Sequence, residues 1–128
     1  MCMVDDSDGL VTVLRESTPM ARKEHRCDEC GRGICVGERY LNEGILWQGE
    51  KNTHKTCAHC QQVRSWLLTE CGGWVFSGLR EDINEHALEG YGFGVLRLSA
   101  GIRRKWKRKD GRLWPIPKPV KTSLGPLA

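Results

Sequence analysis

The chain has 128 residues, of which 28% are charged and only 7% are aromatic, so we expect one domain with a modest apolar core. The first residues, Met1–Asp6, carry neither the basic nor the apolar stretch of a secretion signal, and no later run is long and apolar enough to cross a bilayer. These features argue against secreted and membrane-embedded proteins and lead us to expect a soluble protein of the cytoplasm.

The net charge of +4 is unevenly distributed along the chain. Residues 1–26 carry four basic and five acidic groups, and residues 27–96 carry six basic and ten acidic groups. Residues 97–128 carry ten basic groups and one acidic group, a net charge of +9. Almost all of the basic excess therefore lies in the last quarter, which indicates the kind of partner rather than the fold.

Residues 1–20 form an acidic amino-terminal segment, in which the β-prone run over residues 10–14 predicts a strand. Thr18-Pro19 marks a break after this run, because proline offers no backbone donor to a sheet. Residues 21–26 then lead into the first of two cysteine pairs.

The two Cys-x-x-Cys pairs, Cys27 with Cys30 and Cys57 with Cys60, are the strongest chemical signal in the sequence. A gap of two residues lets one tight turn direct two thiolates at the same point, and two such turns supply the four soft ligands of tetrahedral Zn²⁺. The total of seven cysteines is odd, and no secretion signal is visible, so a set of disulfides is not favoured. The spacing predicts a closed, structural zinc site.

The segment between and after these pairs predicts a hairpin followed by a helix. Glycines after Cys30 supply open backbone angles, and β-prone residues near positions 34 and 40 and over 45–53 predict strands. Thr56 is a suitable N-cap, and apolar residues at positions 63, 66 and 67 have helical spacing. The helix would end at Gly72-Gly73 and would carry the second cysteine pair in its first turn.

A knuckle, a hairpin and a helix in this order, from Cys27 to about Cys71, resemble the treble-clef zinc fingers. The motif Ala-Arg-Lys-x-His-Arg-Cys-x-x-Cys-Gly, followed by Ile-x-x-Gly-Glu-Arg-Tyr, is similar to small zinc proteins encoded by bacteriophages and prophages, many of which have no assigned function. The resemblance covers roughly residues 20–80. It implies an α+β fold, a small treble-clef domain with added C-terminal helices, and a host bacterial cytoplasm. It implies no particular activity.

His54 offers an alternative to Cys60 as the fourth ligand. A site of three thiolates and one imidazole, from Cys27, Cys30, His54 and Cys57, would resemble the first zinc of a LIM domain. That family needs further ligands after Cys60, and Val63 occupies the expected spacing. We therefore assign Cys60 as the fourth ligand and expect His54 to lie beside the site. The alternative, in which His54 replaces Cys60 as the ligand, stays open at the level of the sequence.

The sequence does not predict an enzyme. A closed four-thiolate site has no open position for water or substrate. HNH nucleases also use a treble-clef frame, but they need a histidine on the hairpin, and none lies between Cys30 and Lys51. The helix after His59 offers only two glutamines where metal-binding residues would be needed. We expect neither catalytic residues nor a small-molecule substrate.

The rest of the chain predicts two more helices and a tail. Residues 79–89 and 95–109 have apolar positions at helical spacing, and the prolines from position 115 onward indicate an extended tail. The predicted organisation is an amino-terminal segment over 1–20, the zinc domain over 21–78, a helical extension with a basic helix over 79–112, and a Pro-rich tail over 113–128.

The basic cluster near the end of the predicted third helix is the second functional signal. Closely spaced like charges repel one another, and a polyanion would relieve this repulsion while releasing its counterions. The alternative is a solvated helix that docks through the stripe formed by Ile102 and Trp106. Membrane binding is not expected because this stripe is thin. The candidate nucleic-acid-binding residues are Arg103, Arg104, Lys105, Trp106, Lys107, Arg108, Lys109 and Arg112, with Trp106 anchoring the helix or stacking on a base.

Two functions from different classes follow from these features. The first is a zinc-stabilised nucleic-acid-binding accessory or regulatory protein that contacts phosphates without reading sequence. The alternative is a protein-interaction module that binds and inhibits or redirects a host protein complex, using acidic residues at positions 81, 82, 85 and 89. Neither DNA nor RNA is favoured by the sequence, and neither are a particular partner or an oligomeric state.

Overall fold

A computed structural model of the chain describes residues 11–119, so the parts of the amino-terminal segment and the tail beyond them lie outside the description. The fold is mixed, with two small antiparallel sheets and three helices. The elements in chain order are β1 (Val11–Ser17), β2 (His25–Arg26), β3 (Gly33–Ile34), β4 (Tyr40–Trp47), β5 (Glu50–Cys57), α1 (Ala58–Cys71), α2 (Leu79–Leu88) and α3 (Phe93–Arg103).

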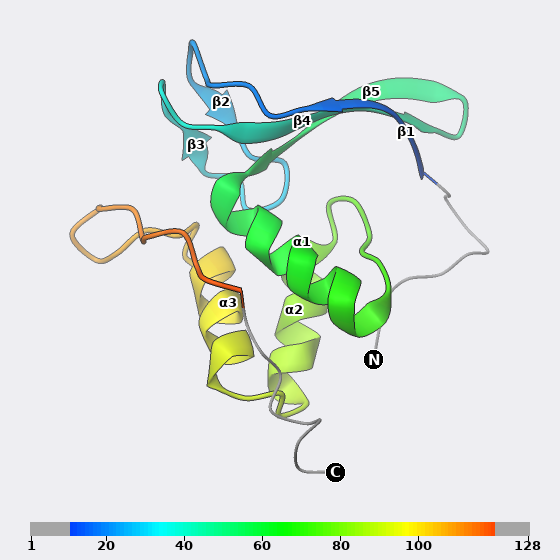
Figure 1. The fold of residues 1–128 in the computed structure, drawn as a ribbon. Helices are drawn as coiled ribbons and strands as arrows, with labels where there is room; N and C mark the ends of the chain where they lie inside the picture. The colour runs from blue at the N-terminus through cyan, green and yellow to red at the C-terminus, as the bar shows by residue number, and fades with distance from the viewer. Residues whose placement is uncertain (1–10, 120–128) are drawn as a thin grey trace.

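The larger sheet has the strand order β1-β4-β5 and forms the upper layer in Figure 1, above the helices. The strand predicted over residues 10–14 is confirmed for its described part, which lies in β1. β4 and β5 are joined by a two-residue turn whose residues Gln48 and Gly49 both have positive φ, the backbone that matches the natural strand twist. The register pairs Tyr40 with Cys57, so the second cysteine pair begins where the hairpin ends.

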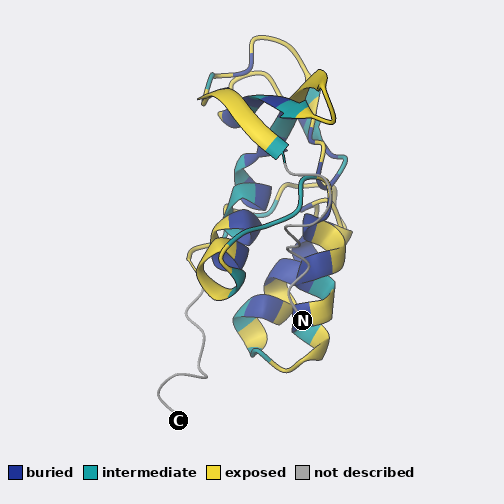
Figure 2. Cartoon of the chain, turned by 90° about the vertical axis from the view of Figure 1, so that its right-hand side faces the viewer, coloured by how far each residue is buried: buried dark blue, intermediate teal, exposed yellow. Residues whose placement is uncertain are grey.

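Helix α1 leaves the end of β5 and packs beneath the sheet. The buried guanidinium of Arg64 donates to the buried carboxylate of Glu43 on β4 at 2.8 Å, and it lies over the ring of Trp74 at 4.4 Å. Helices α2 and α3 pack side by side below α1 (Figure 1), and buried residues cluster on the faces that meet (Figure 2). The apolar residues of this lower layer are Val63, Leu67, Leu79, Ile83, Val95, Leu98 and Ile102.

The third helix is shorter than the sequence predicted, because α3 ends at Arg103 rather than near position 109. Lys105 and Trp106 both have positive φ, which reverses the chain, and the N–H of Trp106 donates to the carbonyl of Gly101 at 2.8 Å. The ring of Trp106 then lies directly against Gly101, where a side chain would collide with it. The apolar stripe is thus buried as expected, but Trp106 reaches it by folding back rather than by continuing the helix.

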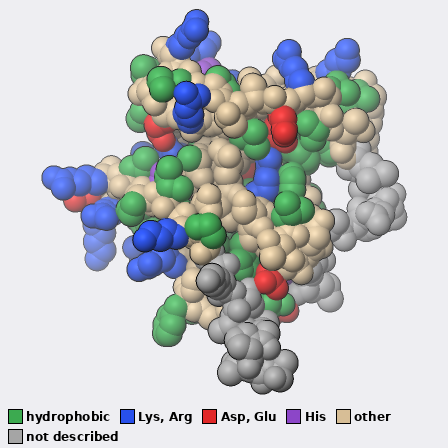
Figure 3. Space-filling view, in the orientation of Figure 1, with side chains coloured by type: hydrophobic (Ala, Val, Ile, Leu, Met, Phe, Trp, Pro, Cys, Tyr) green, Lys and Arg blue, Asp and Glu red, His purple; other side chains and the backbone are tan. Residues whose placement is uncertain are grey.

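The residues after α3 form a loop, where the sequence predicted that a basic helix would continue. The N–H of Trp114 donates to the carbonyl of Trp106, and the N–H of Arg108 donates to the carbonyl of Arg112, both at 2.7 Å. We call residues 103–112, which begin at the last residue of α3, the basic loop. In Figure 3 Lys and Arg side chains gather at the left of the molecule, where Figure 1 places this loop.

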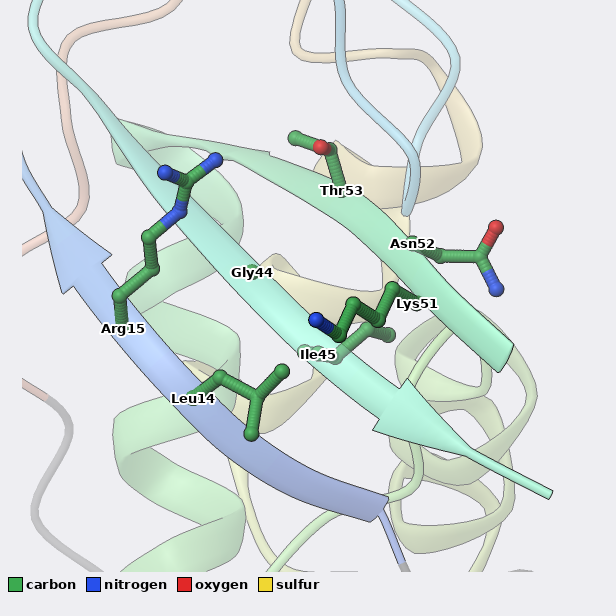
Figure 4. Close-up of a pocket in the computed structure, with 7 residues that line it drawn as sticks. All are labelled: Leu14, Arg15, Gly44, Ile45, Lys51, Asn52 and Thr53. Carbon is green, nitrogen blue, oxygen red and sulfur yellow. The ribbon is translucent and has the colours of Figure 1, made fainter. Parts of the chain in front are cut away.

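The sheet carries a shallow hollow of about 490 Å³, lined by residues of all three strands. Figure 4 shows these residues, with the side chain of Arg15 on β1 reaching toward the central strand, where it passes over Gly44. The hollow shares no residue with the two cysteine pairs. Among the described helices, none has the length and apolarity that a membrane span requires.

Candidate metal centre

The two cysteine pairs meet in space. Their four sulfur atoms lie within 4.8 Å of one another, and all four residues are buried. Cys27 and Cys30 lie in the turn between β2 and β3, Cys57 is the N-cap of α1, and Cys60 lies in the first turn of that helix. All four are free thiols, so the alternative of disulfides within or between these pairs is wrong.

The spacing of the sulfurs fits a tetrahedral metal ion. Bonds of 2.3 Å to a central Zn²⁺ would place neighbouring sulfurs about 3.8 Å apart, and the sulfurs of Cys30 and Cys57 are separated by 3.9 Å. Four sulfur donors in a tetrahedron suit zinc or iron, and among the described residues the cluster contains sulfur donors alone. The residues present therefore fit a single metal ion of this type.

Hydrogen bonds to the sulfurs favour the thiolate form that a metal requires. The backbone N–H groups of Glu29 and Cys57 donate to Cys27 Sγ, and that of Cys60 donates to Cys57 Sγ, each at 3.4 Å. The indole N–H of Trp106 donates to Cys60 Sγ at 3.3 Å. Donors of this kind tune a metal centre by spreading the negative charge of its ligands.

The thiols also influence one another. Hydrogen bonds from Cys27, Cys30 and Cys60 lower the pKa of Cys57 far below its ordinary value. The interaction with Cys27 is the largest cause that raises the pKa of Cys30 and of Cys60. Without a metal, the four neighbouring thiols therefore keep some of their protons and hydrogen-bond to the thiolate among them. A bound cation would bring all four to the thiolate form.

His54 lies outside the cysteine cluster. Its Nε2 lies 2.8 Å from a carboxylate oxygen of Glu29, which stands between Cys27 and Cys30 in the sequence and has a buried side chain. The same carboxylate accepts from the N–H of Ser77 at 2.7 Å and from the N–H of Leu79, at the start of α2, at 3.3 Å. Cys60 rather than His54 thus completes the set, and Glu29 joins the knuckle to α2.

Arg32 and His59 form a second bridge, which joins the metal centre to the C-terminal segment. The buried Arg32 guanidinium donates to both carboxylate oxygens of Glu38, at 2.8 and 3.1 Å, and lies 3.1 Å from His59 Nδ1. Because a guanidinium can only donate, His59 Nδ1 must accept, which leaves Nε2–H to donate to the carbonyl of Trp114 at 2.6 Å.

Charge near the sulfurs favours a cationic Arg32. Burial by itself lowers the pKa of Arg32, but the hydrogen bond that Arg32 donates to Glu38 and the negative charge of Cys57 outweigh burial and raise the pKa overall. A buried cation beside the cluster offsets part of the negative charge that four thiolates would carry. Sequence reasoning missed Glu29 and Arg32. Their positions inside and just after a Cys-x-x-Cys-Gly motif are the only sequence signal that they carry.

The candidate nucleic-acid-binding residues divide into two groups. The basic side chains of the basic loop are all exposed, namely Arg103, Arg104, Lys105, Lys107, Arg108, Lys109 and Arg112. Trp106 is fully buried and contacts Gly101, His59 and Cys60, so it has no open face on which a base could stack. This corrects the stacking role predicted for Trp106 and leaves the anchoring role.

The metal centre and the basic loop are neighbours. Gly31 follows the first cysteine pair, and a Cβ built on it would lie 3.5 Å from the guanidinium of Arg26 and 3.7 Å from Cε of Lys105. Trp106 connects the base of the basic loop to Cys60. A cationic surface therefore begins at the turn that carries the first cysteine pair and continues into the basic loop.

Comparisons of this chain with protein-family models, with curated proteins and with solved structures give no match. The resemblance to treble-clef fingers and to bacteriophage zinc proteins therefore stays a prediction from the sequence motifs.

Proposed function

We propose that this chain is a zinc-stabilised protein that binds nucleic acid through its basic loop. The observation that carries the proposal is that seven cationic side chains within ten residues are exposed, beside a single acidic residue, Asp110. Exposed cations gathered on one segment are the electrostatic footprint of phosphate binding. Contacts of this kind position a protein on nucleic acid without reading its sequence.

Zinc is the metal that we assign to the four cysteines, in a treble-clef arrangement. The support is the order of a knuckle between β2 and β3, a hairpin of β4 and β5, and a helix whose first turn carries the last two ligands. Because all four positions of the tetrahedron would be filled by cysteine, the ion would stabilise the fold rather than activate water. We accordingly propose that the protein is not an enzyme.

The shape of the basic loop supports phosphate binding better than the predicted helix would. The hydrogen bond between Trp106, within the loop, and Trp114, just after it, closes this part of the chain. Both tryptophans are also bonded to the first turn of α1, Trp106 to Cys60 and Trp114 to His59. The cations are therefore held on a fixed base, and less conformational entropy is lost when they meet a polyanion.

Binding of labelled DNA and RNA oligonucleotides across a salt series tests the proposal. One variant replaces the basic residues of 103–109 by glutamine, and a control replaces the same number of exposed cations elsewhere, namely Arg15, Arg22, Lys23, Arg39, Lys51 and Arg80. We expect salt-steep binding that the loop variant loses and the control largely keeps, because the two variants have the same net charge. No binding at low salt, or an equal loss in both variants, would contradict the proposal.

One observation favours the alternative of a protein-interaction module. Leu88 and Phe93, on either side of the turn between α2 and α3, are 88% and 90% exposed, which is unusual for large apolar side chains. Of the acidic residues predicted to serve this role, Asp82 is buried and cannot face a partner. A variant with Leu88 and Phe93 replaced by serine separates the two functions, because it leaves every charge of the basic loop in place.

A further inference from the structure

A groove of about 720 Å³ lies between α3, the basic loop and the segment that follows it. Five cationic residues line it, namely Arg97, Arg104, Arg108, Lys109 and Lys118. The rest of its lining is the apolar run from Trp114 to Pro117, and no acidic residue of the described chain lines it. In Figure 3 hydrophobic side chains lie next to the gathered Lys and Arg side chains on this side of the molecule.

Trp114 is held in place at the edge of this groove. Its N–H donates to the carbonyl of Trp106, its carbonyl accepts from His59, and its ring meets the ring of Trp106 edge to face at a centroid distance of 5.9 Å. The side chain remains only half-buried. A second hollow, of about 550 Å³, shares Trp114 and Arg97 with the groove and includes the exposed Phe93.

The mixture of cations and apolar surface in this groove indicates the form of nucleic acid that it suits. A duplex presents phosphates to a protein and keeps its bases stacked inside, so it would leave the apolar part of the groove unused. A single strand presents phosphates and bare bases together, and such strands bind where a cationic groove carries aromatic side chains. Pro115 and Pro117 stiffen the apolar wall, which limits the entropy lost on binding.

We propose that this groove seats single-stranded nucleic acid, with a base against Trp114 and the flanking phosphates on Arg104 and Arg108. This inference rests on the proposed function and names its substrate class and its site. It assigns stacking to Trp114, which the sequence analysis did not single out, in place of the buried Trp106.

The test compares a labelled single-stranded oligothymidylate and oligouridylate with a duplex of equal length, using the full zinc-loaded chain. We expect the single strands to bind more tightly and to quench tryptophan fluorescence. Trp114→Ala should weaken single-strand binding roughly five- to a hundredfold, the range found for replacing one stacking aromatic side chain by alanine, and should weaken duplex binding much less. Trp47→Ala, which removes an exposed tryptophan of the sheet, is the matched control.

The outcomes separate this inference from the proposed function. Equal affinity for duplex and single strand, both lost on neutralising the basic loop, would overturn the groove assignment and leave nucleic-acid binding intact. Displacement of the oligonucleotide by polyglutamate at equal charge concentration would also overturn it, because a base-free polyanion would then suffice. Absence of binding to every oligonucleotide would overturn both. If Trp114→Ala does not fold, Ile116→Ala and ultraviolet cross-linking to the peptide 113–118 give the same decision.

Discussion

Glu29 shows how one side chain can join a metal centre to a distant part of the fold. It stands between Cys27 and Cys30, yet its buried carboxylate accepts hydrogen bonds from His54 and from two backbone N–H groups at the start of α2. A buried acceptor that satisfies several donors is costly to remove, because each donor is then left without a partner. The start of α2 is therefore attached by this residue to the turn that carries the first cysteine pair.

Replacing Glu29 by glutamine should destabilise the protein by about 1–3 kcal/mol, because an amide keeps one accepting oxygen and turns an N–H₂ group toward the remaining donors. Chemical denaturation in the presence of excess zinc measures this free energy of unfolding. Glu50→Gln, at an exposed position of the β4–β5 hairpin, is the control and should change it little. Equal stability of the two variants would show that the carboxylate is not needed.

Trp106 is the second residue whose role can be isolated. Trp106→Phe removes the indole N–H that donates to Cys60 Sγ and keeps an aromatic ring in the same place. Loss of a hydrogen bond next to the ligand set typically weakens metal binding by about tenfold or more, so we expect a similar loss of zinc affinity. Competition with a chromophoric chelator measures it, with Trp47→Phe as the control. An unchanged affinity would mean that the hydrogen bond has no influence on the metal.

At the scale of the element, the end of α3 decides where the basic residues point. Apolar spacing through Ile102 and Trp106 suggested that the helix continues, because a buried residue four positions on from another satisfies the helical pattern. In the structure Ile102 and Trp106 are both buried, but the helix does not continue between them. The chain reverses at Lys105, and the indole ring of Trp106 packs on Gly101. Helical periodicity indicates which residues are buried, but it does not show whether the chain between them is a continuous helix. The repulsion among the adjacent cations also favours ending the helix early.

Gly101→Ala tests this packing directly. Alanine is intrinsically better than glycine in a helix by about 1 kcal/mol, so a gain in stability would be expected if nothing contacted this position. The added methyl group would instead collide with the outer ring of Trp106, and we expect a net loss of about 1–2 kcal/mol by thermal or chemical denaturation. In a Trp106→Phe background, which lacks the outer ring, the loss should shrink. A stabilised single variant would rule out this docking.

At the scale of the whole molecule, the features that the sequence predicts are those determined by residues close together in the chain. The spacing within each cysteine pair fixes a turn, the apolar steps indicate α1, and the charge count locates the cationic segment. The N-cap prediction was wrong by one residue, because Cys57 rather than Thr56 caps α1 and its sulfur accepts from the N–H of Cys60. The bridges of Glu29 to residues 77–79 and of His59 to Trp114 join positions far apart in the chain, and no local pattern signals them. The groove beside Trp114 likewise needs α3, the basic loop and the following segment to come together.

These long-range bridges make the metal centre the point on which the layers converge. The knuckle contacts α2 through Glu29. The first turn of α1 contacts the C-terminal segment through His59 and the basic loop through the bond between Cys60 and Trp106. The apolar core is small, and a structural zinc ion in a module of this kind contributes on the order of 10 kcal/mol to folding. The central claim is therefore that one zinc ion, held by Cys27, Cys30, Cys57 and Cys60, organises the whole fold.

A native mass spectrum of the full chain, recorded before and after removal of metal by a chelator, tests this claim most directly. We predict one zinc ion per chain with a narrow set of low charge states, and, after chelation, a metal-free mass with a broad shift to the high charge states of an unfolded chain. A metal-free chain that keeps the same narrow, low charge states would contradict the account, because the fold would then not depend on the four cysteines holding an ion.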